Sequence, residues 1–186
     1  MTIHRIRLLG DPVLRAQCER IADPKSLAVR MVAADLRETL LDWQSRMGAG
    51  RGIAAPQIGA PIRLVHVEME KPWTLVNPEI VDIGTDDFLV WDDCFSFPNL
   101  WVRVLRAYHI RVRYQDLNGD EHEVDLEGDR AELLQHEIDH LDGVLAVDRA
   151  YGLDPFCLRE EWHRHHAHEG RYSEPTQRTA QFMTVV

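Results

Sequence analysis

Apolar residues recur at intervals of three and four between Ser26 and Met47, which is the pattern of a helix with one buried face. Ser26 is suited to cap the start of such a helix, and Gly48 and Gly50 are suited to end it. We therefore predict a long amphipathic helix here, whose buried face is formed by Val29, Val32, Leu36, Leu40 and Trp43.

Short apolar or alternating stretches follow and predict β-strands. Apolar and charged residues alternate in the stretch Ile110–Tyr114, as in a strand with one buried face. The pair Asn118-Gly119 favours a tight hairpin turn after it. The predicted strands are Ile62–Val67, Trp73–Val76, Phe88–Trp91, Leu100–Leu105, Ile110–Tyr114 and Glu121–Leu126.

Two further helices are predicted toward the C-terminus. One runs from about Asp129 to Leu141 and ends before Gly143. Another begins near Asp154, continues through Trp162, and is followed by a polar tail. A helix, many short strands and further helices indicate an α+β fold with antiparallel sheet.

Composition and charge narrow the class of protein. A chain of 186 residues with 45% hydrophobic and 28% charged residues is typical of a single globular domain. It has no apolar run long enough for a membrane span, and Met1–Leu9 has no apolar core of a secretory signal. Three widely spaced cysteines favour a reducing, cytoplasmic location. The net charge of −10 disfavours nucleic acid and anionic membranes as partners.

The segment from His136 to His140 has the pattern H-E-x-x-H and lies in the second predicted helix. Residues four apart share one helix face, so both imidazoles can reach one metal ion. Glu137 is then placed to take a proton from a water molecule and return it to a leaving amine. The alternative is a polar helix face with two solvated histidines. The pattern arises by chance in roughly one such chain in 25, so the helical context matters.

A catalytic metal usually has three protein ligands, and the third ligand distinguishes classes of enzyme. A metzincin protease needs a histidine where this chain has Ala146, which excludes that class. A gluzincin protease would use a glutamate about twenty residues downstream, where Glu160 lies. A distant cysteine is the third option, and Cys94 with two histidines suits iron(II), zinc, nickel or cobalt.

Three motifs together resemble those of the peptide deformylase family. They are Gly50-Arg51-Gly52-Ile53-Ala54-Ala55-Pro56-Gln57, Asp92-Asp93-Cys94-Phe95-Ser96, and the segment from Gln135 to Gly143. The resemblance covers about residues 4–150, and it implies antiparallel strands packed around a central metal-binding helix. Residues 151–186 are then expected to add a helix and a polar tail to the same domain. These enzymes remove the formyl group from N-formylmethionine on newly made proteins.

The resemblance also implies roles for individual residues. Cys94, His136 and His140 would bind one divalent metal ion, with iron(II) the first choice and zinc, nickel or cobalt as alternatives. Glu137 would be the general acid and base. Gln57 and the backbone N–H of Phe95 would stabilise the oxyanion. Gly52 of the first motif would bind the substrate, because its backbone would approach an extended peptide.

The chain departs from the family pattern at several positions. Asp92 replaces a glutamate, and Asp93 replaces a glycine beside the thiolate, where strain or like-charge repulsion is a concern. Arg51 and Glu132 stand where the family has apolar residues near the methionine side chain. We expect them to pair across the pocket as substrate-binding residues; the alternative is that Glu132 points to solvent.

The C-terminal segment has no clear function in sequence. Four histidines lie close together there without ordered acidic or cysteine partners, which favours a solvated cluster: His163, His165, His166 and His168. Residues 155–186 hold four Arg and four Glu, so docking to the ribosome is not favoured. The leading hypothesis is a deformylase acting on formylmethionine. The alternatives are a divergent deformylase for another N-formylated or small N-acylated substrate, a non-catalytic homologue, and a gluzincin protease.

Overall fold

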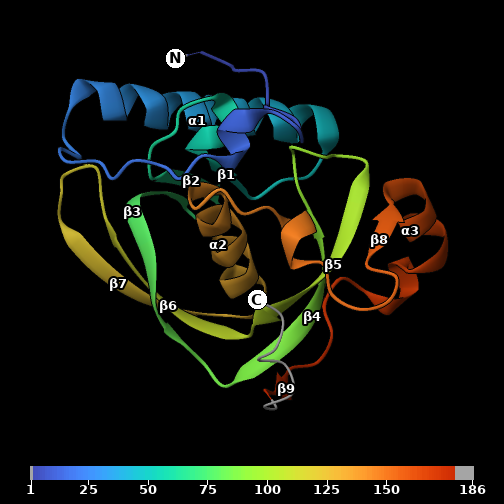
Figure 1. Cartoon of the computed structure of the whole chain (residues 1–186). Helices are drawn as coiled ribbons and strands as arrows, with labels where there is room; N and C mark the ends of the chain where they lie inside the picture. The colour runs from blue at the N-terminus through green and yellow to red at the C-terminus, as the bar shows by residue number, and fades with distance from the viewer. Residues whose placement is uncertain (1, 179–186) are drawn as a thin grey trace.

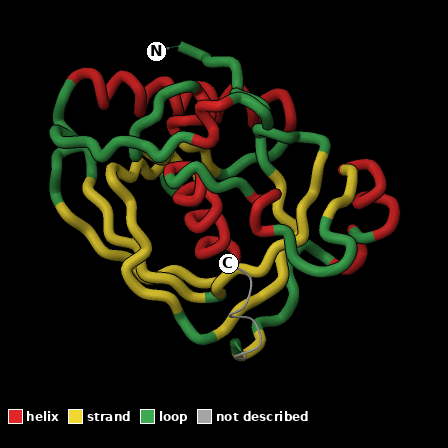
Figure 2. Tube along the Cα trace, in the orientation of Figure 1, coloured by secondary structure: helices red, strands yellow, loops and turns green. Residues whose placement is uncertain are grey.

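The computed structural model describes residues 2–178 and places one helix, α2 (Gly128–Leu141), between two antiparallel sheets. Figure 1 shows α2 near the centre, with the long helix α1 (Leu27–Met47) lying across one side of the molecule. Figure 2 shows the strands curving around α2. This arrangement is the predicted α+β fold with antiparallel strands around a central helix.

Helix α1 forms where the apolar pattern predicts it. The Ser26 hydroxyl accepts a hydrogen bond from the Val29 N–H, and this satisfies one of the free donors of the first turn. Gly48 ends the helix in the left-handed conformation, with φ of 70°. The buried face, which includes Leu36 and Leu40, packs into one cluster of the hydrophobic core.

The first sheet has the strand order β1-β2-β3-β6-β7. The hairpin between β6 and β7 forms as predicted, with Gly119 at φ 78°. One predicted strand is longer than expected, because β3 continues through Pro78 with a register shift next to Asn77, which has φ of 52°. The strands are β1 (Gly52–Ala54), β2 (Leu64–Glu68), β3 (Pro72–Ile83), β6 (His109–Gln115) and β7 (Glu121–Glu127).

The second sheet has the order β8-β5-β4-β9 and contains the C-terminal part of the chain. The predicted helix from Asp154 was wrong at its start, because Phe156–Leu158 pairs with β5 as a strand and the helix begins only at Arg159. The polar tail also returns to this sheet, where residues 176–177 pair with β4. Residues 179–186 of that tail lie outside the described residues. The elements are β4 (Asp86–Asp93), β5 (Leu100–Ala107), β8 (Phe156–Leu158), α3 (Arg159–His165) and β9 (Thr176–Gln177).

Helix α2 is buried along most of its length, and it therefore carries charged side chains into the interior. Its apolar residues, including Leu134 and Leu141, pack in the core between the helix and the first sheet. Gly143 follows the helix with φ of 72°, and a Cβ there would lie 2.7 Å from the Arg15 carbonyl oxygen. Glycine is therefore required at this turn, and it fixes where α2 ends.

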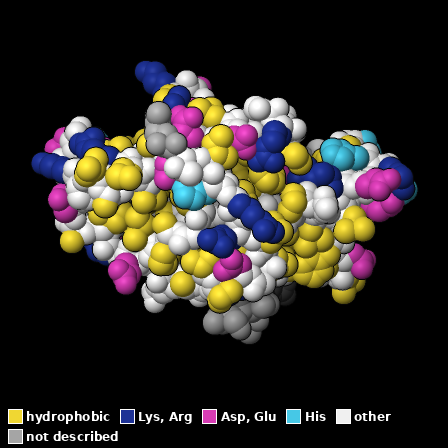
Figure 3. All heavy atoms as spheres, turned by 90° about the horizontal axis from the view of Figure 1, so that it is seen from above, with side chains coloured by type: hydrophobic (Ala, Val, Ile, Leu, Met, Phe, Trp, Pro, Cys, Tyr) yellow, Lys and Arg dark blue, Asp and Glu magenta, His cyan; other side chains and the backbone are white. Residues whose placement is uncertain are grey.

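The surface carries charges of both signs among scattered hydrophobic side chains (Figure 3). His side chains gather on this face at the end where α3 lies. The partners of these histidines are surface carboxylates, such as Glu161 for His165 and Glu169 for His166. Within residues 2–178, no helix is both long and apolar enough to cross a membrane.

Candidate active site

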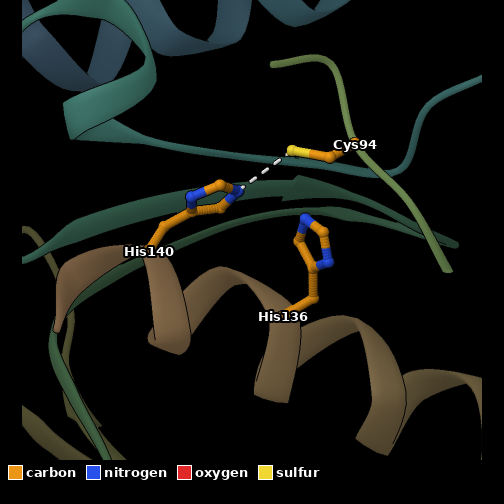
Figure 4. A group of neighbouring side chains, drawn as sticks. All are labelled: Cys94, His136 and His140. Carbon is orange, nitrogen blue, oxygen red and sulfur yellow. Dashed lines mark hydrogen bonds between the residues drawn. The ribbon is translucent and has the colours of Figure 1, made fainter. Parts of the chain in front are cut away.

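Cys94, His136 and His140 come together beside a cavity of about 380 Å³, which Cys94 and His136 line. Figure 4 shows the thiol approaching from the segment after β4, while the two imidazoles project from successive turns of α2. The Cys94 Sγ lies 3.2 Å from His140 Nε2, and one ligand atom from each of the three residues lies within 4.8 Å of the others. All three side chains are buried.

A carboxylate orients the first of these histidines. Asp92 Oδ1 lies 2.9 Å from His136 Nδ1, so the imidazole directs its other nitrogen away from Asp92. Burial lowers the pKa of His136, but Asp92 and Cys94 together outweigh burial and raise the pKa well above the usual value. Arg106 also binds Asp92, at 3.0 Å, and holds this carboxylate in place.

The donor set suits a divalent metal ion. Burial lowers the pKa of His140 well below its usual value, so this imidazole is neutral, which is the form that binds metals. One thiol and two imidazoles are ligands of iron, zinc, nickel and cobalt. The arrangement therefore fits the metal that the motifs imply.

Glu137 lies beside the cluster and lines the same cavity. Its Oε2 atom is buried and has no hydrogen-bond partner among the described residues. Burial raises the pKa of this carboxyl to about 7. A Cβ at Gly52 would lie 2.6 Å from Glu137 Oε1, so the glycine leaves the space that the carboxylate occupies. This close approach is a reason for Gly52 that the motif alone does not reveal.

Gln57 and Phe95 lie on the other side of the thiol. The Gln57 side-chain oxygen accepts a hydrogen bond from the Ala54 N–H, which turns its NH₂ group toward the Cys94 Sγ at 3.5 Å. Phe95 directly follows Cys94, and its ring stacks on Trp43 with 4.5 Å between the centroids. Donor groups are thus fixed beside the candidate metal ligands.

The wall of the cavity around Glu132 is polar, and this is where the chain departs from the family pattern. The Glu132 side chain is only 3% exposed, and its Oε2 lies 2.6 Å from Arg51 Nη2. The alternative in which Glu132 points to solvent is therefore wrong, and the expected pair is present. The Tyr172 hydroxyl also donates to Glu132 at 3.4 Å, and Arg171 lines the cavity nearby.

Asp93 does not strain the backbone. It is the last residue of β4, and Asn77 is the one non-glycine residue with positive φ in the described part of the chain. The Asp93 carboxylate binds Arg159 at 2.7 Å and Arg171 at 2.9 Å. Two guanidinium groups thus offset the negative charge beside Cys94.

The sequence pattern does not predict that two residues of the site lie there. Arg171 and Tyr172 belong to the polar C-terminal segment, which backbone hydrogen bonds attach to β4. Arg171 thereby lines the cavity, and Tyr172 reaches Glu132. The other candidate ligand, Glu160, lies on exposed α3 with Arg164 as its partner. Glu160 does not join the buried ligand atoms of His136 and His140 in the described part of the chain, so the protease alternative loses its third ligand.

The fold and the buried Cys-His-His cluster beside a free carboxylate define a metal-dependent hydrolase. The polypeptide deformylase family model matches residues 3–155. The chain is 35% identical to a peptide deformylase of Thermotoga maritima over 164 residues, which are 86% of this chain and 94% of that one. It is 38% identical to a peptide deformylase of Dictyoglomus thermophilum over 151 residues, covering 80% and 93%.

Solved structures agree with these relatives. The crystal structure of the Thermotoga maritima enzyme superposes with a TM-score of 0.76 at 34% identity, covering 82% of this chain and all of that one. The chain belongs to the peptide deformylase family, whose members are metallohydrolases that act on formylated peptides.

Proposed function

We propose that this protein hydrolyses the N-formyl amide of peptides that begin with formylmethionine. The observation that carries the proposal is the convergence of Cys94, His136 and His140 beside the buried, unpartnered carboxylate of Glu137. A protein that only binds formylated peptides has no need for a general base in this position. The observation therefore favours catalysis over the non-catalytic alternative.

Cys94, His136 and His140 would hold one divalent metal ion, with iron(II) as the first choice and zinc, nickel or cobalt as alternatives. The bound metal would act as a Lewis acid and lower the pKa of a water molecule to near neutrality. Asp92 supports this role, because a carboxylate on the second nitrogen of a histidine fixes the orientation of the ligand.

Glu137 would move the proton. A carboxyl group with a pKa of about 7 can accept a proton at neutral pH and give it up again. It takes this proton from the attacking water as the bond to the formyl carbon forms. It then delivers the proton to the amine nitrogen as the carbon–nitrogen bond breaks, which yields formate and a free N-terminus.

Gln57 and the backbone N–H of Phe95 would stabilise the charge that develops on the formyl oxygen. The Gln57 amide is held in advance by its bond to Ala54, so little reorganisation is needed when the oxyanion forms. The Gly52 backbone would lie along an extended substrate. Nascent chains are made in the cytoplasm, so we place the protein there, acting without stable docking to the ribosome.

The direct test measures formate release from formyl-Met-Ala-Ser by protein purified without oxygen and loaded with iron(II). We expect turnover by the wild type, and loss of both metal and turnover in Cys94→Ala. Glu160→Ala is the matched control, and it should retain both. Metal bound by the wild type without formate release would overturn the proposal, and so would metal loss in Glu160→Ala alone.

A further inference from the structure

The end of the cavity next to the reacting amide is polar. Glu132 precedes His136 by about one turn of α2, so the two side chains share a helix face about 6 Å apart along the axis. The first side chain of a peptide substrate begins roughly 2.5 Å from the amide nitrogen, because only two bonds separate them. A substrate side chain on this side of the amide therefore meets Glu132.

The Glu132 carboxylate has one committed oxygen and one free oxygen. Oε2 accepts hydrogen bonds from Arg51 at 2.6 Å and from Tyr172 at 3.4 Å. Within residues 2–178, the hydrogen bonds to this side chain all end on Oε2. Glu132 lines the cavity, so its remaining oxygen is an acceptor that a substrate can reach.

Both arginines of this wall, Arg51 and Arg171, also donate to groups other than Glu132. The second terminal nitrogen of Arg51, Nη1, donates to the Asp129 backbone carbonyl at 3.0 Å and lies 3.3 Å from the Asp129 carboxylate. Arg171 donates to Asp93 and to the Trp91 carbonyl. The free oxygen of Glu132 is thus an acceptor in the cavity lining to which no described side chain donates. A methionine thioether cannot satisfy a buried carboxylate, because it has no hydrogen to donate.

We propose that Glu132, held by Arg51 and Tyr172, makes this pocket selective for N-formyl peptides whose first side chain donates a hydrogen bond. Hydrolysis of such peptides would be faster than that of formylmethionine peptides. The inference rests on the proposed deformylase function and narrows its substrate class. It also makes the C-terminal segment part of the substrate site, because Arg171 lines the cavity and Tyr172 holds Glu132.

Three substrates of matched size test the inference without any variant. Methionine, glutamine and glutamate side chains are similar in length, but only glutamine donates hydrogen bonds at neutral pH. We expect kcat/KM for formyl-Gln-Ala-Ser to exceed that for formyl-Met-Ala-Ser about tenfold or more, since a buried polar group left unpaired is costly. Formyl-Glu-Ala-Ser should be the slowest, because two carboxylates would meet in the pocket.

Variants of Glu132 and Arg51 then test whether these two residues cause the substrate preference. Glu132→Leu should reverse the preference by raising kcat/KM for formyl-Met-Ala-Ser and lowering it for formyl-Gln-Ala-Ser. Arg51→Leu combined with Glu132→Leu removes both charges and guards against misfolding of the single variant. Asp129→Asn is the matched control: it changes the other carboxylate partner of Arg51, which lies outside the cavity lining, and should leave the ratio unchanged.

The outcomes separate this inference from the proposed function. Formate release from formyl-Met-Ala-Ser at a rate equal to or above that from formyl-Gln-Ala-Ser would overturn the inference and leave the deformylase function intact. No formate from any of the three peptides, with metal bound, would overturn both. A ratio that is the same in the wild type and in Glu132→Leu would show that Glu132 does not set the preference.

Discussion

The two halves of α2 support the active site in different ways. The C-terminal half carries His136, Glu137 and His140, and a network of buried charges fixes its position. Arg106 joins Asp92, which orients His136, to Asp139 on the same helix, and both contacts are buried. The N-terminal half carries Glu132, whose partners come from the loop before β1 and from the C-terminal segment.

This difference separates chemistry from specificity. The partners of the C-terminal half are strands β4 and β5, whose arrangement is set by the core of the second sheet. The partners of Glu132 lie outside strands β4 and β5: Arg51 precedes β1 and is 30% exposed, and Tyr172 belongs to the C-terminal segment. One helix can therefore keep the metal chemistry of its family while its first turns serve a different substrate pocket.

The largest expected effect lies in the C-terminal half. Glu137→Gln removes the proton acceptor but keeps the shape of the side chain. We expect kcat for formate release to fall by about 10²- to 10⁴-fold, because general acid–base catalysis contributes that much. Metal content should stay near one per chain, as the three ligands are untouched. A decrease of less than tenfold would mean that another group moves the proton.

Breaking the buried network should mainly affect stability. Asp139→Asn leaves Arg106 and Arg149 with a neutral partner, and Arg106 is almost completely buried. We expect the free energy of unfolding in urea to fall by about 3–5 kcal/mol. The control is Asp42→Asn, which weakens an exposed ion pair with Arg46 and should cost less than about 1 kcal/mol. Equal losses in the two variants would contradict the rigid-network description.

The sequence predicts the functional contacts of the C-terminal half of α2 better than those of the N-terminal half. The spacing of His136 and His140 is local, so the helix period alone places both on one face. Cys94 depended on the resemblance, because nothing local indicates that the end of β4 approaches α2.

The rest of the site depends on long-range backbone pairing. Trp91 donates its N–H to the Arg171 carbonyl at 2.8 Å, and this bond attaches a polar segment to β4. Apolar periodicity carries no information about such pairing, so the contact between Tyr172 and Glu132 was not predictable. Pairing with β5 likewise makes Phe156–Leu158 a strand where a helix was expected, since an available sheet edge overrides weak helix propensity.

A smaller effect should follow from loosening one ligand without removing it. Asp92→Asn weakens the bond that orients His136, and we expect the affinity for zinc to fall about 10- to 100-fold. Competition with a chelator of known affinity measures this directly. Arg106 also loses a charged partner in this variant. The affinity is therefore measured without denaturant, after circular dichroism has shown that the variant is folded. Unchanged affinity would show that the β4 backbone alone positions this histidine.

The smallest effect tests whether the C-terminal segment is held independently of the metal-binding half. Asp93→Asn weakens the ion pairs to Arg159 and Arg171, all three side chains being about a quarter to a third exposed. Because such pairs are partly screened by solvent, we expect a loss of roughly 1 kcal/mol or less.

Hydrogen exchange distinguishes a local effect of Asp93→Asn from a global one. Amides of residues 159–172 should exchange faster in the variant, whereas those of residues 128–141 should keep their protection. The backbone bonds between the segment and β4 remain, so the segment should stay in place and open more often. Faster exchange in α2 as well would mean that the same contacts stabilise both halves of the helix. The proposed difference between the two halves would then be wrong.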